Sequence, residues 1–346
     1  MVYSSHGGNS SLLTFLSIFV ALAIALTSTF AGQFAKSALT LDEKLFSAPY
    51  SMTYLNTLFM IPLYPIYLLI KKNFTQTTVK TVHKDAVKLL EDRKGSRYPN
   101  WTILIAGLII LAGWIAPNYI FVVSLKFISV SAATSINSLN AALVFIISII
   151  WLKEAFSWFK ACGVLLSIAG VVLVSMDSNF TGSITGVILV LSCALCIALY
   201  NTTFKKVFGD LTFSQVLFFL SLLGLTNLIF NTLPAVLMIY FDLDRIVWTA
   251  VPWTAIFANA LLATLFNISV NFGIAILNPL VVSIGILMGI PISAAVDILL
   301  RDLQAGLTIL IGGVLISLGF CLNTLPFDEW IGKRNSVVDK RKHQAV

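Results

Sequence analysis

Charged residues are scarce in this sequence. Asp, Glu, Lys and Arg make up 11% of the 346 residues, whereas they make up about 25% of a soluble domain. In their place, 58% of the residues are hydrophobic and the mean hydropathy is +0.94. This composition excludes an ordinary soluble protein and indicates one that is largely embedded in a lipid bilayer. The net charge of +7 does not predict nucleic-acid binding, because the positions of the charges matter more than their sum.

Residues and motifs for catalysis or metal binding are also scarce. The three histidines, His6, His83 and His343, fall in polar segments, so none is available for a metal site or a proton relay inside the membrane. The sequence has no Walker-type loop and no HExxH or GxSxG motif, so ATP-driven pumping and hydrolysis have no support. The four cysteines lie in apolar segments, which predicts small buried side chains rather than disulfides or a metal site. We therefore expect neither a cofactor nor an enzymatic activity.

Long apolar segments fill most of the chain. A membrane helix needs roughly 20 apolar residues, and these segments have that length without the alternation of a strand. The predicted spans are 11–35, 46–70, 102–124, 129–152, 158–176, 183–203, 213–240, 252–275, 279–300 and 305–325.

The two halves of the chain resemble each other. Residues 163–168 (GVLLSI) recur as 313–318 (GVLISL), and residues 21–26 recur as 194–199. Because each half has five spans, an odd number, the second half should cross the membrane in the opposite orientation. The predicted fold is an all-α membrane protein with ten transmembrane helices in two inverted five-helix repeats. The first repeat is 1–176 with a basic loop at 71–100, the second is 177–326, and 327–346 is a basic tail.

Lys and Arg are distributed unevenly. The even-numbered connections and the two tails hold 17 of the 22 basic residues. The positive-inside rule therefore predicts an integral, multi-pass protein with both termini and the 71–100 loop in the cytosol. Binding of lipid headgroups or of a partner protein is an alternative role for this loop. The sequence leaves open whether the membrane is the plasma membrane or a Golgi or other endomembrane.

Amide and hydroxyl side chains inside the spans predict where a solute binds. An amide facing lipid is costly, so these side chains should face other helices or a wet cavity. Hydrogen bonding between helices is the alternative role for each of them. Since both halves contribute amides, we expect a polar cavity near the middle of the membrane. The candidate solute-binding residues are Asn118, Tyr119, Asn140, Tyr200, Asn201, Asn227, Asn267 and Asn271.

Asp297 is the only carboxylate well inside a predicted span, so it joins these candidates. It is placed to neutralise a cationic solute or to carry a coupling proton. Arg301 follows one helical turn later, which makes an ion pair the alternative. Amides with one acid and no basic residue at mid-depth favour a neutral or cationic organic solute over a nucleotide sugar, whose diphosphate needs fixed positive charge.

Several segments resemble the F subfamily of solute carrier family 35, within the drug/metabolite transporter superfamily. They are 46–50 (FSAPY), 221–227 (SLLGLTN), Pro252-Trp253, and 267–275 (NISVNFGIA) continued by Pro279, Gly285, Pro291 and Asp297. The resemblance runs over residues 11–332 and points to the thiamine-transporter branch. It implies ten helices in two inverted repeats and movement of a small organic solute by alternating access. At Ala141 and Asn201 the chain differs from that branch, which has lysine at both positions.

The leading interpretation is a multi-pass secondary transporter of a thiamine-like or other cationic solute. A nucleotide-sugar transporter and a non-transporting membrane scaffold or receptor are the alternatives. The expected partners are a small-molecule solute and the lipid bilayer, but no nucleic acid. A homodimer is left open.

Overall fold

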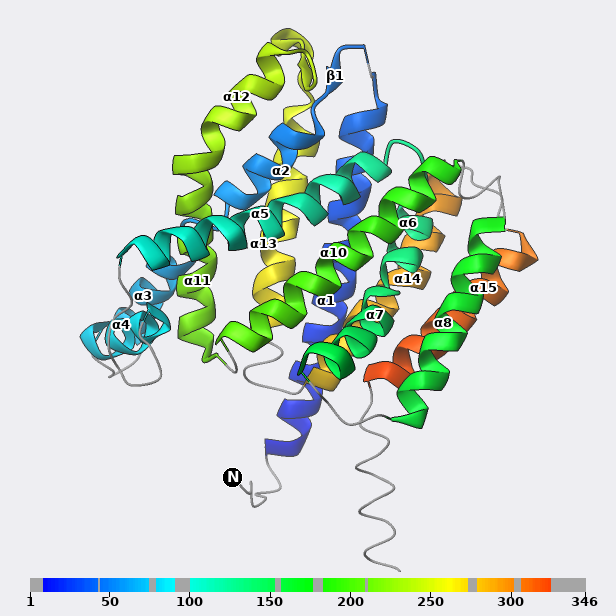
Figure 1. The fold of residues 1–346 in the computed structure, drawn as a ribbon, viewed down its shortest axis with the longest axis horizontal. Coiled ribbons are helices and arrows are strands. Elements are labelled where there is room, and N and C mark those ends of the chain that lie inside the picture. The colour runs from blue at the N-terminus through cyan, green and yellow to red at the C-terminus, as the bar shows by residue number, and fades with distance from the viewer. Residues whose placement is uncertain are drawn as a thin grey trace, which may run out of the picture.

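The computed structural model describes residues 9–42, 44–74, 79–90, 100–152, 157–176, 183–208, 211–272, 279–301 and 306–324. In these ranges the protein is a bundle of long helices with one small pair of strands at one end (Figure 1). Each of the ten predicted spans coincides with helical structure, so the prediction of a mostly helical protein is confirmed.

The first half contains α1 to α8. Their bounds are α1 (Asn9–Thr40), α2 (Pro49–Leu58), α3 (Leu63–Phe74), α4 (Val79–Val87) with a 3-10 turn at Lys88–Leu90, α5 (Asn100–Ser124), α6 (Val130–Asn137), α7 (Asn140–Ile147) with a π-helical stretch at Ser148–Leu152, and α8 (Trp158–Met176).

The second half contains α10 to α15. Their bounds are α10 (Ile184–Phe208), α11 (Phe213–Thr226), a π-helical stretch at Asn227–Asn231, α12 (Thr232–Tyr240), a 3-10 turn at Trp248–Ala250, α13 (Trp253–Phe272), α14 (Pro279–Arg301) and α15 (Leu307–Thr324). The strands β1 (Phe46–Ser47) and β2 (Arg245–Ile246) pair antiparallel, with Phe46 opposite Ile246, and so join the two halves.

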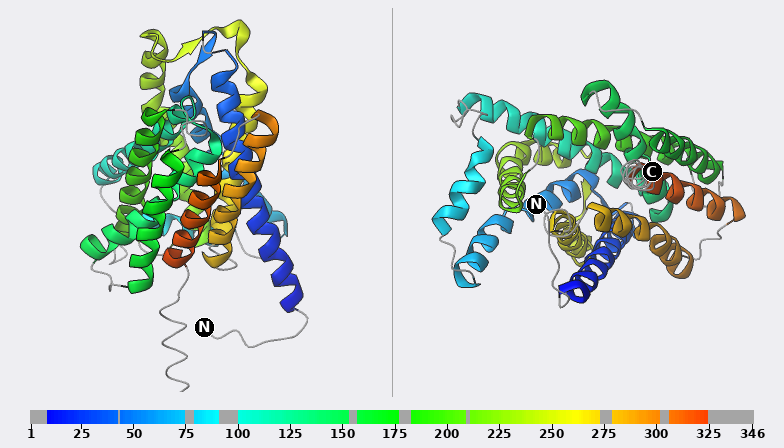
Figure 2. Two further views of the ribbon diagram at one scale, coloured as in Figure 1. Left: turned by 90° about the vertical axis from the view of Figure 1, so that its right-hand side faces the viewer. Right: turned by 90° about the horizontal axis from the view of Figure 1, so that it is seen from below.

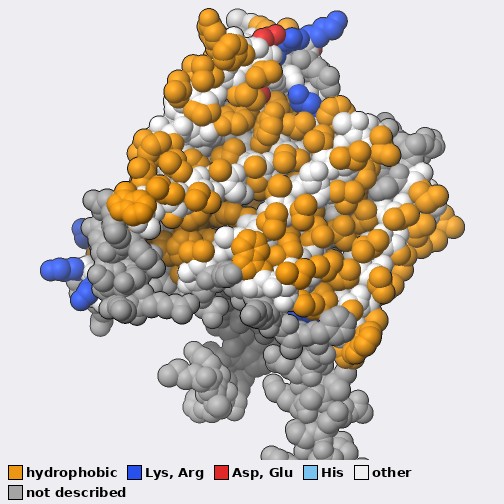
Figure 3. All heavy atoms as spheres, in the orientation of Figure 1, with side chains coloured by type: hydrophobic (Ala, Val, Ile, Leu, Met, Phe, Trp, Pro, Cys, Tyr) orange, Lys and Arg blue, Asp and Glu red, His pale blue; other side chains and the backbone are white. Residues whose placement is uncertain are grey.

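Seven helical stretches in the described ranges are long and apolar enough to cross a membrane. They are Ile18–Thr40, Pro49–Phe74, Trp101–Ser124, Val130–Trp151, Ile184–Phe204, Phe213–Tyr240 and Trp253–Val270. Hydrophobic side chains cover most of the face in Figure 3, as expected for a surface in contact with lipid. Three further apolar helices are shorter, at Trp158–Leu173, Met288–Leu300 and Leu310–Gly319. The protein is thus an integral membrane protein, while ten crossings stay a prediction.

Three predicted spans are not continuous α-helices. The second is interrupted between α2 and α3, next to Pro62, because proline has no N–H to donate and obstructs the preceding turn. The fourth is interrupted between Asn137 and Asn140, so these two amides end one helix and begin the next. The seventh passes through the π-helical stretch Asn227–Asn231. Such interruptions are common where a helix has a functional role.

The first helix is longer than predicted. It continues past residue 35 to Thr40 and so includes Lys36, which the sequence placed in a connection. The Lys36 ammonium group donates hydrogen bonds to the carbonyl oxygens of Leu125, at 3.0 Å, and of Ile128. These carbonyls lie just after α5 ends, where backbone oxygens lack helical partners. The long side chain thus lets a charged residue remain within the helix.

The packing of the helices follows a repeated pattern (Figures 1 and 2). In the first half α1 packs along α13 and α14 of the second half, while α10 of the second half packs along α5, α6 and α7 of the first. The helices α8 and α15 pack closely against each other. Every one of these contacts joins one half to the other, so neither half has its core alone.

Glycines allow α8 and α15 to approach closely. A Cβ atom on Gly319 would lie 2.5 Å from the carbonyl oxygen of Gly163 and 2.7 Å from the backbone nitrogen of Ser167. On the opposite helix, a Cβ on Gly170 would lie 2.6 Å from the carbonyl oxygen of Gly312. Small residues at such an interface are the usual way in which membrane helices associate.

We expect Gly319→Val to separate α8 from α15, since the obstructing atoms belong to the backbone and cannot rotate away. Overpacking of this kind costs about 1–3 kcal/mol. The matched control is Gly313→Val on the same helix, where a Cβ meets nothing within 4 Å. Thermal unfolding in detergent should show a lower midpoint for Gly319→Val than for Gly313→Val. Equal midpoints would contradict this packing.

The described ends of the chain predict a topology. The Asn9 end of α1, the Thr324 end of α15 and helix α4 all lie toward the lower edge in Figure 1, opposite the strands. Together with the basic residues, this arrangement predicts that both termini are cytosolic. Tags placed at residues 1 and 346 should both be protected from protease added to the non-cytosolic side of sealed vesicles. Cleavage of either tag from that side would refute the topology.

Candidate functional site

A cavity lined by both polar and apolar side chains lies between helices of the two halves. It contains about 310 Å³ of space not filled by protein atoms, part of it open to solvent. Helices α2 and α5 of the first half and α13 of the second provide its walls. The residues that line it are Thr53, Asn56, Thr57, Met60, Trp114, Asn118, Val122, Ala263 and Asn267.

Two of the predicted amides meet in this cavity. Asn118 comes from α5 and Asn267 from α13, and each donates a hydrogen bond from Nδ2 to a carbonyl one turn earlier in its own helix. The acceptors are the carbonyls of Trp114, at 2.7 Å, and of Ala263, at 2.8 Å. The two amide oxygens are hydrogen-bond acceptors. A solute with N–H or O–H groups is a suitable donor for them.

The wall formed by α2 was not predicted. Asn56 lines the cavity, and its Oδ1 accepts a hydrogen bond of 3.0 Å from Nδ2 of Asn259 on α13. Thr53 and Thr57 donate to carbonyls within α2, at 2.9 and 3.0 Å, so their hydroxyl oxygens still have lone pairs to offer. In the sequence, Asn56 and Asn259 are amides inside apolar spans, like the predicted candidates. Only the packing of α2 against α13 shows that they lie at the cavity wall.

Aromatic side chains border the cavity. Trp114 lines it, and Tyr200 of α10 packs edge-on against Trp114 with ring centroids 6.0 Å apart. Tyr200 therefore lies behind the lining rather than in it. Tyr119 is half-buried, and its ring lies 5.5 Å from that of Tyr50 in an edge-to-face contact. Among the described residues that line the cavity, Trp114 is thus the aromatic one.

The other predicted amides lie elsewhere. Asn227 is fully buried, donates to the carbonyl of Tyr54 at 3.1 Å and accepts from Asn231 at 2.9 Å, which are contacts that hold helices together. Asn140 is half-buried and Asn201 is exposed, and neither lines the cavity. The side chain of Asn271 falls outside the part of the chain that the structure describes.

Asp297 lies in a tight polar contact and does not line the cavity. It is fully buried on α14, where Oδ1 accepts 2.7 Å from Nε2 of Gln33 on α1. Its Oδ2 accepts from the backbone N–H of Ser131, at 2.7 Å, and from the Ser131 hydroxyl, at 2.5 Å. Ser131 belongs to the first turn of α6, whose free N–H groups favour a carboxylate. The side chain of Arg301, the predicted ion-pair partner, is not among the described residues.

Two carboxylates outside the apolar spans have shifted pKa values. Asp244, between α12 and α13, is buried, and burial raises its pKa even though hydrogen bonds from Ser51 act in the opposite direction. For Asp85 on α4, the hydrogen bond from Ser214 is the main reason that its pKa lies below its ordinary value. Within the described ranges, no three His, Cys, Asp or Glu side chains come together as metal ligands would.

Residues 12–176 match the EamA-like transporter family. Over 94% of its length the chain is 28% identical to human solute carrier family 35 member F3, covering 77% of that protein. Over 88% of its length it is 29% identical to mouse solute carrier family 35 member F4, covering 63% of that protein.

A solved crystal structure shares the fold. The superposition covers 88% of this chain and 96% of the chain in the crystal structure, with a TM-score of 0.53 and 17% sequence identity. The first half of the chain thus matches the EamA-like transporter family, and most of its length is similar to members F3 and F4 of solute carrier family 35.

Proposed function

We propose that this transporter moves a small organic solute by alternating access, with the cavity between α2, α5 and α13 as its binding site. The observation that carries the proposal is that helices of both halves place Asn56, Asn118 and Asn267 around one space. Polar groups grouped at one cavity between repeats are the usual arrangement of a secondary transporter. A scaffold or receptor would not require such a cavity.

An inverted repeat is supported by the packing. If the five spans of one half correspond in order to those of the other, α1 corresponds to α10, α5 to α13, and α6 with α7 to α14. The contacts of α1 with α13 and α14 then have the same form as those of α10 with α5 and with α6 and α7. Two halves related by a two-fold axis in the membrane plane are expected to make such equivalent contacts.

The lining favours a neutral or cationic solute. Among the described residues around the cavity there is no Asp, Glu, Lys, Arg or His. A nucleotide sugar would bring two phosphate charges into this space without a basic partner, which is unfavourable. An organic cation with a heteroaromatic ring fits better, because amide oxygens accept its N–H groups and the Trp114 indole attracts its charge. Thiamine has this chemistry and is the leading candidate.

A ligand screen tests the proposal. Purified protein is heated with thiamine, other organic cations, neutral vitamins or nucleotide sugars, and the unfolding midpoint is measured. A ligand present at 100 times its Kd stabilises the folded state by about 2.7 kcal/mol. We expect thiamine or a related cation to raise the midpoint, and uptake of the same compound into proteoliposomes. Stabilisation by nucleotide sugars alone would contradict the assigned solute class.

Two amide substitutions locate the binding site. Asn267→Ala removes a cavity amide and should weaken ligand binding roughly 2- to 10-fold, the equivalent of one hydrogen bond, while the unfolding midpoint without ligand changes little. Asn227→Ala is the matched control, because it removes an amide buried between helices. It should lower the midpoint and leave the Kd of the surviving folded protein unchanged. The reverse outcome would move the site away from this cavity.

We further propose that Asp297 fixes the start of α6. Asp297→Ala removes both acceptor oxygens from the Gln33 amide and from the Ser131 N–H. An unsatisfied buried donor costs about 1–3 kcal/mol, so the unfolding midpoint should fall. Ser131→Ala, which removes the hydroxyl but keeps the N–H, should cost less. If Asp297→Asn instead keeps the midpoint and abolishes the pH dependence of uptake, the residue carries a proton.

A further inference from the structure

The helices α2–α3 of the first half and α11–α12 of the second are linked by hydrogen bonds near the strands and at the interruption between α2 and α3. Figure 1 shows α11–α12 running from the end that carries α4 to the end that carries the strands. The chain α2–α3 runs beside it in the opposite direction, and each helix of one pair packs against the other pair. We call these four helices, together with α4, which packs against both α3 and α11, the paired unit.

At the strand end, Asp244 holds the start of α2. Ala48, the residue before α2, has no side chain that accepts a hydrogen bond from the first turn. Asp244 supplies the missing acceptor, because its Oδ2 lies 2.6 Å from the Ser51 nitrogen and 2.8 Å from the Ser51 hydroxyl. Its Oδ1 lies 3.3 Å from the Tyr50 nitrogen. The carboxylate thus caps a helix of the other half.

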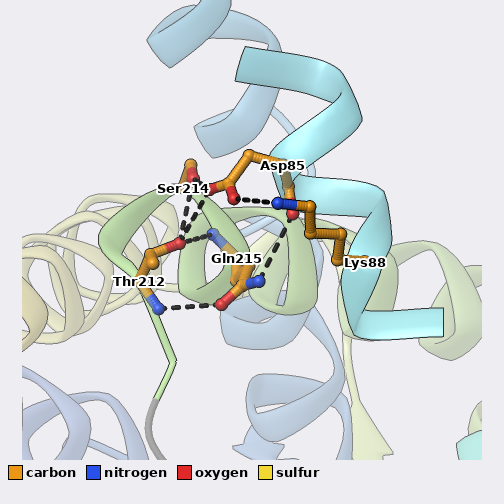
Figure 4. A network of polar contacts seen from close by, with 5 residues as sticks. All are labelled: Asp85, Lys88, Thr212, Ser214 and Gln215. Atoms are coloured by element: carbon orange, nitrogen blue, oxygen red, sulfur yellow. Dashed lines mark hydrogen bonds and ion pairs between the residues drawn. The ribbon is translucent and has the colours of Figure 1, made fainter. Parts of the chain in front are cut away.

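At the opposite end, Asp85 holds the start of α11 (Figure 4). Its Oδ2 accepts from the hydroxyl of Ser214, at 2.9 Å, and from that of Thr212, at 3.1 Å. The amide of Gln215 donates to the backbone carbonyl of Asp85 at 3.3 Å, so the backbone of α4 is held as well. Lys88 lies beside the same carboxylate at 3.4 Å.

Between these ends the contact is also polar. At the interruption between α2 and α3, the Ser221 hydroxyl accepts from the Tyr64 nitrogen at 2.8 Å and lies 3.2 Å from the Met60 carbonyl oxygen. Nearer the strands, the Tyr54 hydroxyl lies 2.6 Å from that of Thr232. A Cβ on Gly224 of α11 would lie 3.0 Å from the Thr57 carbonyl oxygen, so the two backbones nearly touch.

The two aspartates occupy equivalent places in the two halves. Asp85 follows the second span of its half and holds the first turn of α11, the second span of the other half. Asp244 follows the second span of its half and holds the first turn of α2. A two-fold relation between the halves would exchange these contacts. They lie at opposite ends of the same paired unit, which is therefore secured at both.

We propose that the paired unit moves as one body during transport, and that Asp85 and Asp244 are the positioning residues that fix its ends. This inference rests on the proposed function. The moving part then contains one span from each half, so the halves do not rock against each other as wholes. The unit carries Thr53, Asn56, Thr57 and Met60, one wall of the cavity. When the protein changes between its two open states, this wall moves relative to α5 and α13, which carry the opposite wall of the cavity.

Cysteine cross-linking tests the proposal without a known solute. In a variant without the native cysteines, Asn118→Cys reports on the cavity through its reaction with a membrane-impermeant maleimide added to either face of sealed vesicles. With both aspartates intact, labelling from both faces is expected. Ser51→Cys with Asp244→Cys replaces the contact at the strand end, and Asp85→Cys with Ser214→Cys replaces the one at the other end. In each reduced pair, labelling at residue 118, read by mass spectrometry of the peptide that carries it, should be slower, because the carboxylate is gone.

Oxidation of either pair to a disulfide should restore labelling from both faces, since a covalent link then does what the carboxylate did. Loss of labelling from one face on oxidation would overturn the proposal, because the contact would have to open during the cycle. Failure of both pairs to cross-link in folded protein would also overturn it. The matched control is Asn56→Cys with Asn259→Cys, which links α2 to α13 across a 3.0 Å contact. Its disulfide should confine labelling to one face, and labelling from both would count against the proposal.

In the same experiment, the Asn118→Cys variant with both aspartates intact tests the proposed function separately. If the Asn118→Cys variant with intact aspartates is labelled from one face only, alternating access itself is refuted. If that variant is labelled from both faces and an oxidised end pair from one, only the single moving body is refuted.

Discussion

Inside a membrane, a backbone N–H or C=O group that leaves its helix must find a partner within the protein, because no water is present to replace it. The second span leaves helical geometry between α2 and α3. There Ser221 of the other half accepts from the Tyr64 N–H and donates to the Met60 carbonyl, which also accepts from the Leu63 N–H. The packing of α11 therefore stabilises the interruption. The same constraint places Asp244 and Asp297 at the first turns of α2 and α6, where N–H groups are otherwise free.

These contacts make the two halves interdependent. Every carboxylate that holds a helix start in the described ranges belongs to one half and serves the other: Asp85 serves α11, Asp244 serves α2 and Asp297 serves α6. The strands β1 and β2 add a further link between the halves. A five-helix half alone would lack the partners that these carboxylates and helix ends have in the other half.

The sequence predicted the helices of the ten spans because a span needs only an apolar segment of the right length. It did not predict the polar helix α4, which lies in the segment 71–100 that was expected to be a loop. Where spans bend was less visible: Pro62 marks the interruption after α2, but Asn227–Asn231 carries no residue that demands a π-helical stretch. For the cavity, Asn118 and Asn267 were predicted, whereas Asn56 was not. All three are amides in apolar helices, and only the three-dimensional packing separates Asn56 from Asn227, which joins helices. The roles of Asp85 and Asp244 were equally hidden, because their partners are 129 and 193 residues away in the chain.

The distribution of charge separates binding from positioning. The described lining of the cavity has amides, hydroxyls, a thioether and an indole but no ionisable side chain of an acid or base. The carboxylates lie instead at helix starts, where hydroxyl and N–H donors already occupy them. Under the proposed function, a solute in this cavity is selected by its shape and by its hydrogen-bond donors, with the Trp114 face as the main attraction for positive charge.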